Sequence, residues 1–204
     1  GKVCEWVWMN TDKARILNLK ASVHIDGPSH HLDVSPANVV HHPTIDVVGI
    51  HLPKEILEQL RTSGSTKNNV ILHFTYHLDL NNQALDGLYV SKWQDKEGDS
   101  HNIVASQMEA TSARRVFPCV DQPSDKAVFW MVVGCVDCNK LTVLSNMPVA
   151  ASDALPSWSG QMNIQLGWWK ENNKNNRIIH FEPSPVMSTY LLALTVGELE
   201  YSET

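Results

Sequence analysis

The sequence has little cysteine, no excess of positive charge and no long apolar run. Its 204 residues include only four cysteines, too few for a disulfide framework in a chain that can build its own core. Lys and Arg number 16 against 22 Asp and Glu, a net charge of −6, so no basic field attracts phosphate backbones or anionic lipid. No apolar run reaches the roughly 18 residues that a membrane span needs. We therefore expect neither nucleic acid nor a membrane as a partner.

Two further absences concern location. The chain has no N-terminal segment of the secretory type and no Asn-x-Ser/Thr sequon. With the scarce cysteine, these absences favour a reducing, cytoplasmic setting. The chain starts at Gly1 rather than at methionine, which we interpret as a processed start or as part of a longer protein.

The sequence also lacks several signatures of catalysis. It has no Walker loop, no Gly-x-Gly-x-x-Gly and no Gly-x-Ser-x-Gly, so nucleotide binding and serine-hydrolase chemistry are not indicated. It has no His-Glu-x-x-His segment, the usual zinc centre of a metallopeptidase. From its own motifs, the segment is expected to hold no catalytic residue and no metal ligand.

Strand patterns dominate the chain. Residues 70–80 alternate between an apolar face and a polar face, the pattern of a strand with one buried side. Only residues 54–61 have a helical pattern, with Pro53 placed for the first turn and Gly64 available to end the helix. Further strands are expected at 4–9, 16–25, 88–93, 103–107, 127–135, 141–146, 161–168, 177–181 and 191–199. Residues 28–43 are loop-prone, and 95–100 and 171–176 are expected to be hairpin loops.

Turns at intervals of roughly ten residues favour packed β-sheets over other fold classes. With 43% hydrophobic residues, the chain can bury one good core. We expect an all-β protein forming a single domain over residues 1–204.

Ten histidines suggest metal, but their spacing does not support it. His73 and His77 are four apart in an expected strand, where they would be separated by about 13 Å and could not share one ion. The adjacent pairs at 30–31 and 41–42 are more consistent with surface positions. The Cys135-x-x-Cys138 spacing lacks the second pair of a zinc ribbon, because Cys4 and Cys119 do not form one, so we expect a turn with buried thiols.

The segment with the most chemistry is 106–129, SQMEATSARRVFPCVDQPSDKAVF. Gln107 and Glu109 lie two residues apart at the end of an expected strand, so both face one side and could bind an ammonium group. Arg114 and Asp121 are expected to form an ion pair that fixes a proline-containing loop. In an alternative interpretation, Glu109 pairs with Arg114 or Arg115 and the segment has only a structural role.

This segment resembles the N-terminal domain of the aminopeptidase N and puromycin-sensitive aminopeptidase family of zinc metallopeptidases, the gluzincins. The family pattern T-Q-x-E-x-x-x-A-R-R-x-F-P-C-x-D-E-P-x-x-K-A-x-F is matched at Gln107, Glu109, Ala113, Arg114, Arg115, Phe117, Pro118, Cys119, Asp121, Pro123, Lys126 and Ala127. Residues 141–149, LTVLSNMPV, and residues 181–193, FEPSPVMSTYLLA, are similar to two downstream family motifs in the same order. Residues 82–89 are similar to a family turn, and the resemblance extends from about residue 70 to the end.

The resemblance implies the saddle-like β domain of packed mixed sheets that precedes the catalytic domain in this family. The Gly-Ala-Met-Glu-Asn motif and the zinc-binding helix of the family are absent from this sequence. We expect a segment that is inactive alone, in a parent enzyme that uses zinc to remove N-terminal residues from peptides. Its partners would be the substrate N-terminus and the missing catalytic domain.

The resemblance also implies roles for individual residues. Glu109 would bind the free α-ammonium group of a peptide, Gln107 would line the pocket for the first side chain, and Ala110 would lie beside them. The Glu109–Ala110 peptide bond is expected to be cis and to orient Glu109. We expect Arg114 and Asp121 to be structural. Ser106, Gln122 and Val186 depart from the family pattern without altering Glu109.

Two alternatives to a peptidase domain stay open. The same fold also serves as a non-catalytic scaffold for protein interaction, although the presence of Glu109 favours the enzyme. A free-standing sandwich that binds a small ligand is the other alternative, for which no particular residue argues. A domain cut from a larger protein should show an apolar or amide-rich surface patch around residues 107–110, and cover of that region by the chain's own loops would count against this interpretation.

Overall fold

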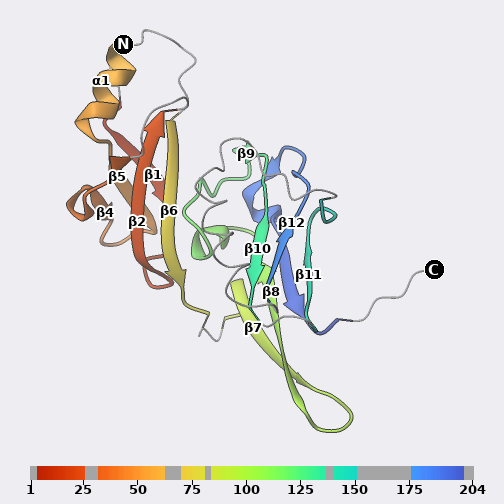
Figure 1. Ribbon diagram of the computed structural model, residues 1–204. Helices are drawn as coiled ribbons and strands as arrows, with labels where there is room; N and C mark the ends of the chain where they lie inside the picture. The colour runs from red at the N-terminus through yellow and green to blue at the C-terminus, as the bar shows by residue number, and fades with distance from the viewer. Residues whose placement is uncertain are drawn as a thin grey trace. The chain divides into compact units, whose positions relative to one another are not determined.

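The chain is mostly β-structure. The computed structural model describes residues 4–25, 32–62, 70–80, 84–136, 140–150 and 176–199. These ranges contain fourteen strands, one α-helix and three short 3-10 helices (Figure 1). All strand pairings among them are antiparallel. The expected all-β class with at most one short helix is confirmed, but the described sheets are antiparallel, whereas the resemblance had implied mixed sheets.

The chain forms two compact units, one of residues 1–80 with 111–121 and one of residues 81–110 with 122–204. The expected single domain over residues 1–204 stays a prediction. No helix in the described ranges is long and apolar enough to cross a bilayer.

The first unit contains two three-stranded sheets, ordered β1-β5-β4 and β3-β2-β6. Its elements are β1 (Trp6–Asn10), β2 (Ile16–Ile25), β3 (Leu32–Asp33), η1 (Pro36–Asn38), β4 (Val39–His41), β5 (Val47–His51), α1 (Lys54–Thr62), β6 (Val70–Leu78) and η2 (Ala113–Arg115).

A continuous apolar core joins the elements of this first unit. Val23 on β2, Val48 and Ile50 on β5, and Ile56 on α1 have no exposed surface and belong to one cluster. Alternate residues of β2 and β5 supply this core because side chains of a strand point to opposite faces in turn. The predicted bounds of β2 are those observed, and the predicted helix over 54–61 is confirmed as α1.

The second unit contains a four-stranded sheet, ordered β11-β14-β8-β7, and two two-stranded pairs, β10-β12 and β13-β9. Its elements are β7 (Gly87–Gln94), β8 (Ser100–Gln107), β9 (Lys126–Ala127), β10 (Val132–Cys135), β11 (Thr142–Ser145), β12 (Arg177–His180), β13 (Met187–Ser188), η4 (Thr189–Leu191) and β14 (Leu194–Gly197). Val143 of β11, Ile179 of β12 and the neighbouring Phe181 form its buried cluster.

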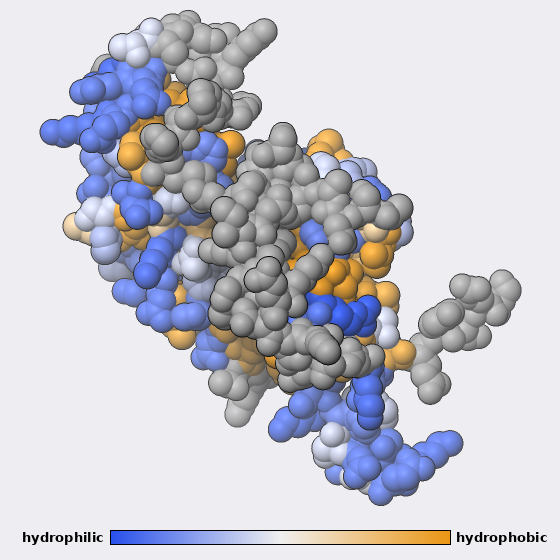
Figure 2. Space-filling view, viewed as in Figure 1, coloured by the Kyte–Doolittle hydropathy of each residue, from blue (hydrophilic) through white to orange (hydrophobic). Residues whose placement is uncertain are grey.

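The hairpin of β7 and β8 extends as a two-stranded ribbon past the rest of its sheet (Figure 1). Its strands pair from Gly87↔Gln107 to Gln94↔Ser100, and residues 95–99 form the turn, close to the predicted hairpin loop. Gly98 has a φ of 91°, a conformation that favours glycine, and its amide donates to the Asp95 carbonyl at 3.2 Å. The tip of the ribbon is hydrophilic (Figure 2).

Several predicted elements differ from those observed. The strand expected over 127–135 is divided into β9 and β10, which pair with different partners, β13 and β12. Residues 28–43 are not only loop, because β3, η1 and β4 lie within them. Strand β5 was not predicted. The strand expected at 161–168 lies outside the described residues, as do Gly64 and residues 171–175 of the second expected hairpin loop.

Candidate functional site

The end of β8 carries the candidate site. Gln107, the last residue of β8, pairs with Gly87 at the start of β7. Gln107 and Glu109 are exposed, whereas the side chain between them, Met108, retains only 3% of its exposure. Successive side chains of an extended segment point to opposite sides. With the Met108 side chain turned into the protein, the Gln107 amide and the Glu109 carboxylate on either side of it are exposed to solvent.

The peptide bond between Glu109 and Ala110 is cis, as the resemblance implied. Ala110 is exposed as well. The three residues expected to contact substrate, Gln107, Glu109 and Ala110, are therefore all exposed in one short segment at the end of β8. Within the unit that contains Glu109, no described side chain forms an ion pair with it.

A glycine with left-handed backbone stands opposite this strand end. Gly87 has a φ of 63° and is buried. Residues that carry a side chain rarely adopt this backbone conformation, so glycine is suited to this turn. Its pairing with Gln107 places the turn segment 84–86 next to the last residue of β8.

Hydrogen bonds join the end of β8 to the two downstream motif segments. The Leu194 amide donates to Ser106 Oγ at 2.8 Å. The Asn146 side chain accepts from the Ala193 amide and donates to the Leu191 carbonyl, both at 2.8 Å. Ser145 Oγ donates to the Ala193 carbonyl at 2.8 Å. These contacts join the end of β8 and the end of β11 to the segment 191–194, which leads into β14 between them in the sheet order β11-β14-β8-β7.

The sequence predicted no contact for Ser106, named only as a departure from the family pattern, or for Asn146, which lies within the motif 141–149. Ser106 is the next-to-last residue of a predicted strand and Asn146 is the last residue of another, which is a weak local signal. Their partners are 88 and 45 residues away for the contacts with Leu194 and Leu191. A single sequence does not reveal partners at such separations.

Arg114 and Asp121 lie in the first unit, where they form an ion pair. Arg114 Nε donates to Asp121 Oδ2 at 2.9 Å, and Asp121 is 3% exposed. The Asp121 amide donates to Asn10 Oδ1 at 3.1 Å, and Asn10 exchanges two backbone hydrogen bonds with Cys119. Residues 114–121 are thus fastened to the end of β1. The geometry fits a structural role.

Arg115 has a different neighbour. Its Nε lies 3.7 Å from Asp12 Oδ2, and the Asp12 amide donates to the Arg114 carbonyl at 2.8 Å. In the alternative interpretation, Arg114 or Arg115 would be engaged by Glu109. Each of the two guanidinium groups has an aspartate of its own unit as a neighbour, and the pairing with Glu109 stays a prediction.

Cys119 is a buried free thiol within the same loop. It is 6% exposed, and burial raises its pKa to about 12, with a smaller contribution from the Asp121 carboxylate. Burial likewise raises the pKa of the Tyr76 hydroxyl to about 12. Both groups are neutral at physiological pH, and a neutral, shielded thiol is a poor nucleophile. Cys119 is therefore suited to packing.

His73 and His77, the two histidines spaced four apart, contact different residues. His73 Nε2 lies 3.1 Å from His24 Nδ1, whereas His77 Nδ1 lies 3.2 Å from Asn18 Nδ2. His41 lies on β4, where burial lowers its pKa. The pair at 30–31 lies outside the described residues. In the described ranges, no group of three His, Cys, Asp or Glu side chains could hold a metal ion.

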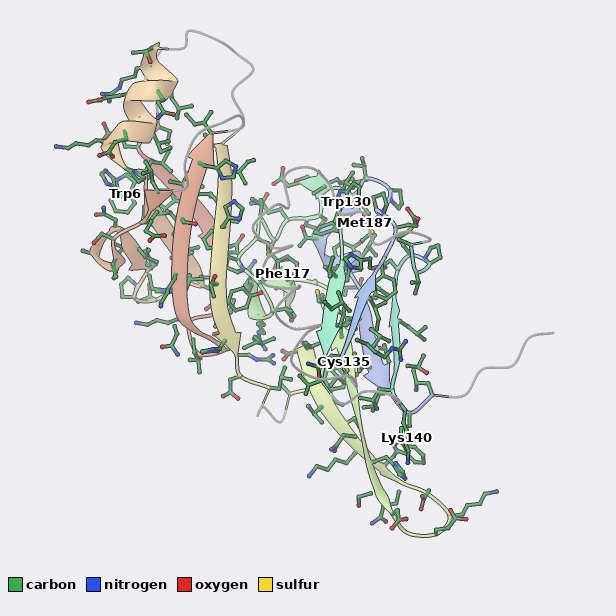
Figure 3. All side chains as sticks on the ribbon, in the orientation of Figure 1. Trp6, Phe117, Trp130, Cys135, Lys140 and Met187 are labelled. Carbon is green, nitrogen blue, oxygen red and sulfur yellow. The ribbon has the colours of Figure 1, made fainter. Side chains whose placement is uncertain are left out.

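The Cys135-x-x-Cys138 motif differs from expectation. Cys135 is disulfide-bonded, so the expected buried free thiol is wrong for this residue. It ends β10, where it pairs with Arg177 of β12 (Figure 3). Cys138 lies outside the described residues. The cytoplasmic location expected from the sequence stays a prediction.

Comparison with known proteins agrees with the motif positions. The family profile of the Peptidase M1 N-terminal domain matches residues 5–191. Aminopeptidase M1-B of Oryza sativa subsp. japonica is 31% identical over 184 residues, which is 90% of this chain and 18% of that protein. Puromycin-sensitive aminopeptidase of Caenorhabditis elegans is 32% identical over 163 residues, 73% of this chain and 15% of that protein. Aminopeptidase N of Rattus norvegicus is 38% identical over 120 residues, 58% of this chain and 10% of that protein.

The chain thus spans less than a fifth of the length of these relatives. The profile match covers most of the sequence, including the residues from 5 to about 70, which precede the stretch where the motifs carry the resemblance. The resemblance stated from three motifs is therefore confirmed over a longer stretch. The chain belongs to the Peptidase M1 N-terminal domain family.

Proposed function

We propose that this chain is the substrate-anchoring domain of a longer zinc aminopeptidase, in which Glu109 binds the free α-ammonium group of a peptide. The observation that carries the proposal is the exposed Gln107 and Glu109 beside the buried Met108 at the end of β8. The family membership and the names of the relatives supply the class of reaction.

The chemistry follows from the two side chains. An ionised carboxylate only accepts hydrogen bonds, and a peptide ammonium group offers three donors. Hydrogen bonds to charged groups contribute roughly 1.5–3 kcal/mol each, so Glu109 would favour peptides with a free N-terminus over blocked ones. The Gln107 amide would contact the first side chain or accept a further hydrogen bond, and Ala110 would lie beside them.

An aminopeptidase must fix the N-terminus at a set distance from the scissile bond. A carboxylate at the end of a strand is suited to this task, because strand ends are more rigid than long loops. The hydrogen bonds of Ser106 and Asn146 to the segment that begins β14 brace this strand end. We therefore assign those two residues a positioning role.

Zinc would be held by the remainder of the parent protein. The described residues offer no group of ligands for it, and the sequence has no His-Glu-x-x-His segment. When bound in the parent, zinc would activate water and polarise the scissile carbonyl. The contribution of this chain is limited to holding the substrate amine, and the chain alone should not cleave peptides.

The catalytic part of the parent is also the proposed partner of the second unit. Large apolar side chains adjoining β9 and β13 in sequence are exposed, among them Val128 at 45%, Trp130 at 46% and Val186 at 66%. Trp130 and Met187 of β13 are labelled in Figure 3. Exposed apolar side chains that gather on one part of a surface often mark an interface. We expect the remaining chain of the parent to cover them.

The test compares two substrates in the full-length parent supplied with zinc. One is a peptide amide with a free N-terminus, and the other is its N-acetylated form. We expect cleavage of the first at least tenfold faster than cleavage of the second. Cleavage of neither would favour the non-catalytic scaffold, and equal cleavage of both would contradict recognition of the amine.

A further inference from the structure

His101 lies between two carboxylates in the second unit, far along β8 from Gln107. Its Nε2 is 2.9 Å from Asp95 Oδ2, and its Nδ1 is 2.7 Å from Glu198 Oε2. The ring also stacks on Trp93, its directly paired neighbour on β7, with centroids 4.5 Å apart and planes 21° apart. Both ring nitrogens and one ring face are therefore engaged.

This arrangement requires the charged form of the imidazole. A neutral imidazole carries one N–H, whereas the imidazolium ion carries two. Each ring nitrogen faces a carboxylate oxygen, which accepts hydrogen bonds but cannot donate when ionised. Loss of one proton would leave a nitrogen lone pair facing a carboxylate at hydrogen-bond distance, and that contact is repulsive.

The electrostatic surroundings agree with this geometry. The hydrogen bond that His101 donates to the Asp95 carboxylate is the largest cause that raises the pKa of His101, and the Glu198 charge acts in the same direction. The same hydrogen bond lowers the pKa of Asp95. A cavity of about 740 Å³ is lined by these three residues together with Trp93, Lys140 and Leu199, so Lys140 is a further charged group at this place. Lys140 is labelled in Figure 3.

The place of Glu198 in the sheet gives the contact a mechanical consequence. Strand β14 pairs with β8 through Thr195↔Ala105, Val196↔Val104 and Gly197↔Ile103. The ladder ends there, and Glu198, the next residue, contacts His101. The outer half of the β7–β8 ribbon therefore extends beyond the β14 ladder and is joined to it through this ion pair.

We propose that His101 is a pH-operated latch, which fastens the outer β7–β8 hairpin to the end of β14 when its ring is charged and releases Glu198 when the ring loses its proton. The latch is independent of Glu109 and of the proposed peptidase role. The latch makes the order of one surface hairpin depend on pH, with release at a pH above the ordinary histidine pKa of about 6.5.

The direction of the response follows from the two pKa shifts. A raised pKa of His101 means that the contribution of the latch is complete below the ordinary histidine pKa of about 6.5 and is lost as pH rises through the raised value. A lowered pKa of Asp95 means that its contribution persists in acid until pH falls through that lowered value. The latch is therefore closed at pH values between the lowered pKa of Asp95 and the raised pKa of His101, and it opens above the raised pKa of His101.

The first test is an NMR titration of the imidazole nitrogens in the 204-residue chain. We expect His101 to titrate above about 6.5 and to return toward that value in Glu198→Gln and in Asp95→Asn. Glu97→Gln is the matched control, because Glu97 is an exposed carboxylate in the same turn but is not among the groups that shift the pKa of His101. A His101 that titrates at or below 6.5 would overturn the proposal.

The second test follows the hairpin itself by 15N relaxation at pH 6 and pH 8.5. For residues 93–101 we expect order parameters near the rigid value of about 0.85 at pH 6 and clearly lower values at pH 8.5. His101→Gln cannot form the ion pair at either pH and should show the lower values at both. Equal order at the two pH values in the unmodified chain would contradict the latch, even if His101 titrates as expected.

Discussion

Arg114 Nε lies 2.9 Å from Oδ2 of Asp121, a carboxylate that is only 3% exposed. The two residues are seven apart, and their ion pair closes the loop that contains Pro118 and Cys119. The Arg114 backbone amide also approaches the same oxygen at 3.3 Å. One buried carboxylate therefore holds both the side chain and the backbone of Arg114.

Removing this carboxylate should destabilise the first unit. In Asp121→Ala, the guanidinium group and the backbone amide of Arg114 lose their common acceptor. Removing one partner of a buried ion pair costs about 3–5 kcal/mol. Arg114 retains about a fifth of its side-chain exposure, so we expect about 3 kcal/mol in the free energy of unfolding. Denaturant titration measures it. Asp33→Ala, at an exposed aspartate, should change the value by less than about 0.5 kcal/mol, and an equal effect of both variants would refute the clamp.

The side chain of Asn146 should matter although it is exposed. Asn146→Ala removes its two hydrogen bonds to the segment that precedes β14, each contributing about 0.5–1.5 kcal/mol. We expect unfolding to become easier by about 1–2 kcal/mol and hydrogen exchange of the Ala193 amide to accelerate. Asn102→Ala, an exposed asparagine on β8, is the control. Unchanged exchange at Ala193 would show that the brace contributes nothing.

Cys119 and Cys4 should react very differently with a thiol reagent. Cys4 is exposed, whereas Cys119 is buried and its pKa is raised to about 12. At pH 8 we expect Cys4 to be alkylated quickly and Cys119 only when the protein opens, because the reactive species is the thiolate. Mass spectrometry of labelled peptides measures both rates. Labelling of the two thiols at similar rates in the folded protein would contradict the burial of Cys119.

The raised pKa of Cys119 also predicts a loss of stability in alkali. An unfolded cysteine ionises near pH 8.5, so the unfolded state binds fewer protons than the folded state above that value. The free energy of unfolding should therefore fall as pH rises from about 8.5 to 10. In Cys119→Ala this decline should be less steep, and an unaltered slope would count against the shifted pKa.

Much of the fold was predictable from the periodic spacing of apolar residues and from the proline and glycine residues between the elements. Strand β2 and helix α1 were found from their periodicity, because each buries one face against a single core. Strand β5 was missed: its residues Val47–His51 form a short apolar run, and such a run does not distinguish a strand from a helix or a loop. The division of the strand expected over 127–135 depends on two different partners, β13 and β12, which a local pattern does not contain.

The candidate site was predictable to the extent that it is local. Gln107, Glu109 and Ala110 are neighbours in sequence, and the family motif identified them together. The brace at Asn146 and the latch at His101 depend on residues far apart in the chain, Leu191 with Ala193 and Glu198 respectively. The state of Cys135 was also misjudged, because spacing alone does not separate a free thiol from a disulfide.

The central claim, that Glu109 recognises the substrate amine, is tested most directly by kcat/KM of the Glu109→Gln parent enzyme on a substrate with a free N-terminus. Loss of one charged hydrogen bond of roughly 1.5–3 kcal/mol corresponds to a fall of about 10- to 150-fold. Glu182→Gln, at another exposed glutamate of the same unit, should leave kcat/KM unchanged. A value for Glu109→Gln within about twofold of the unmodified enzyme would contradict the account.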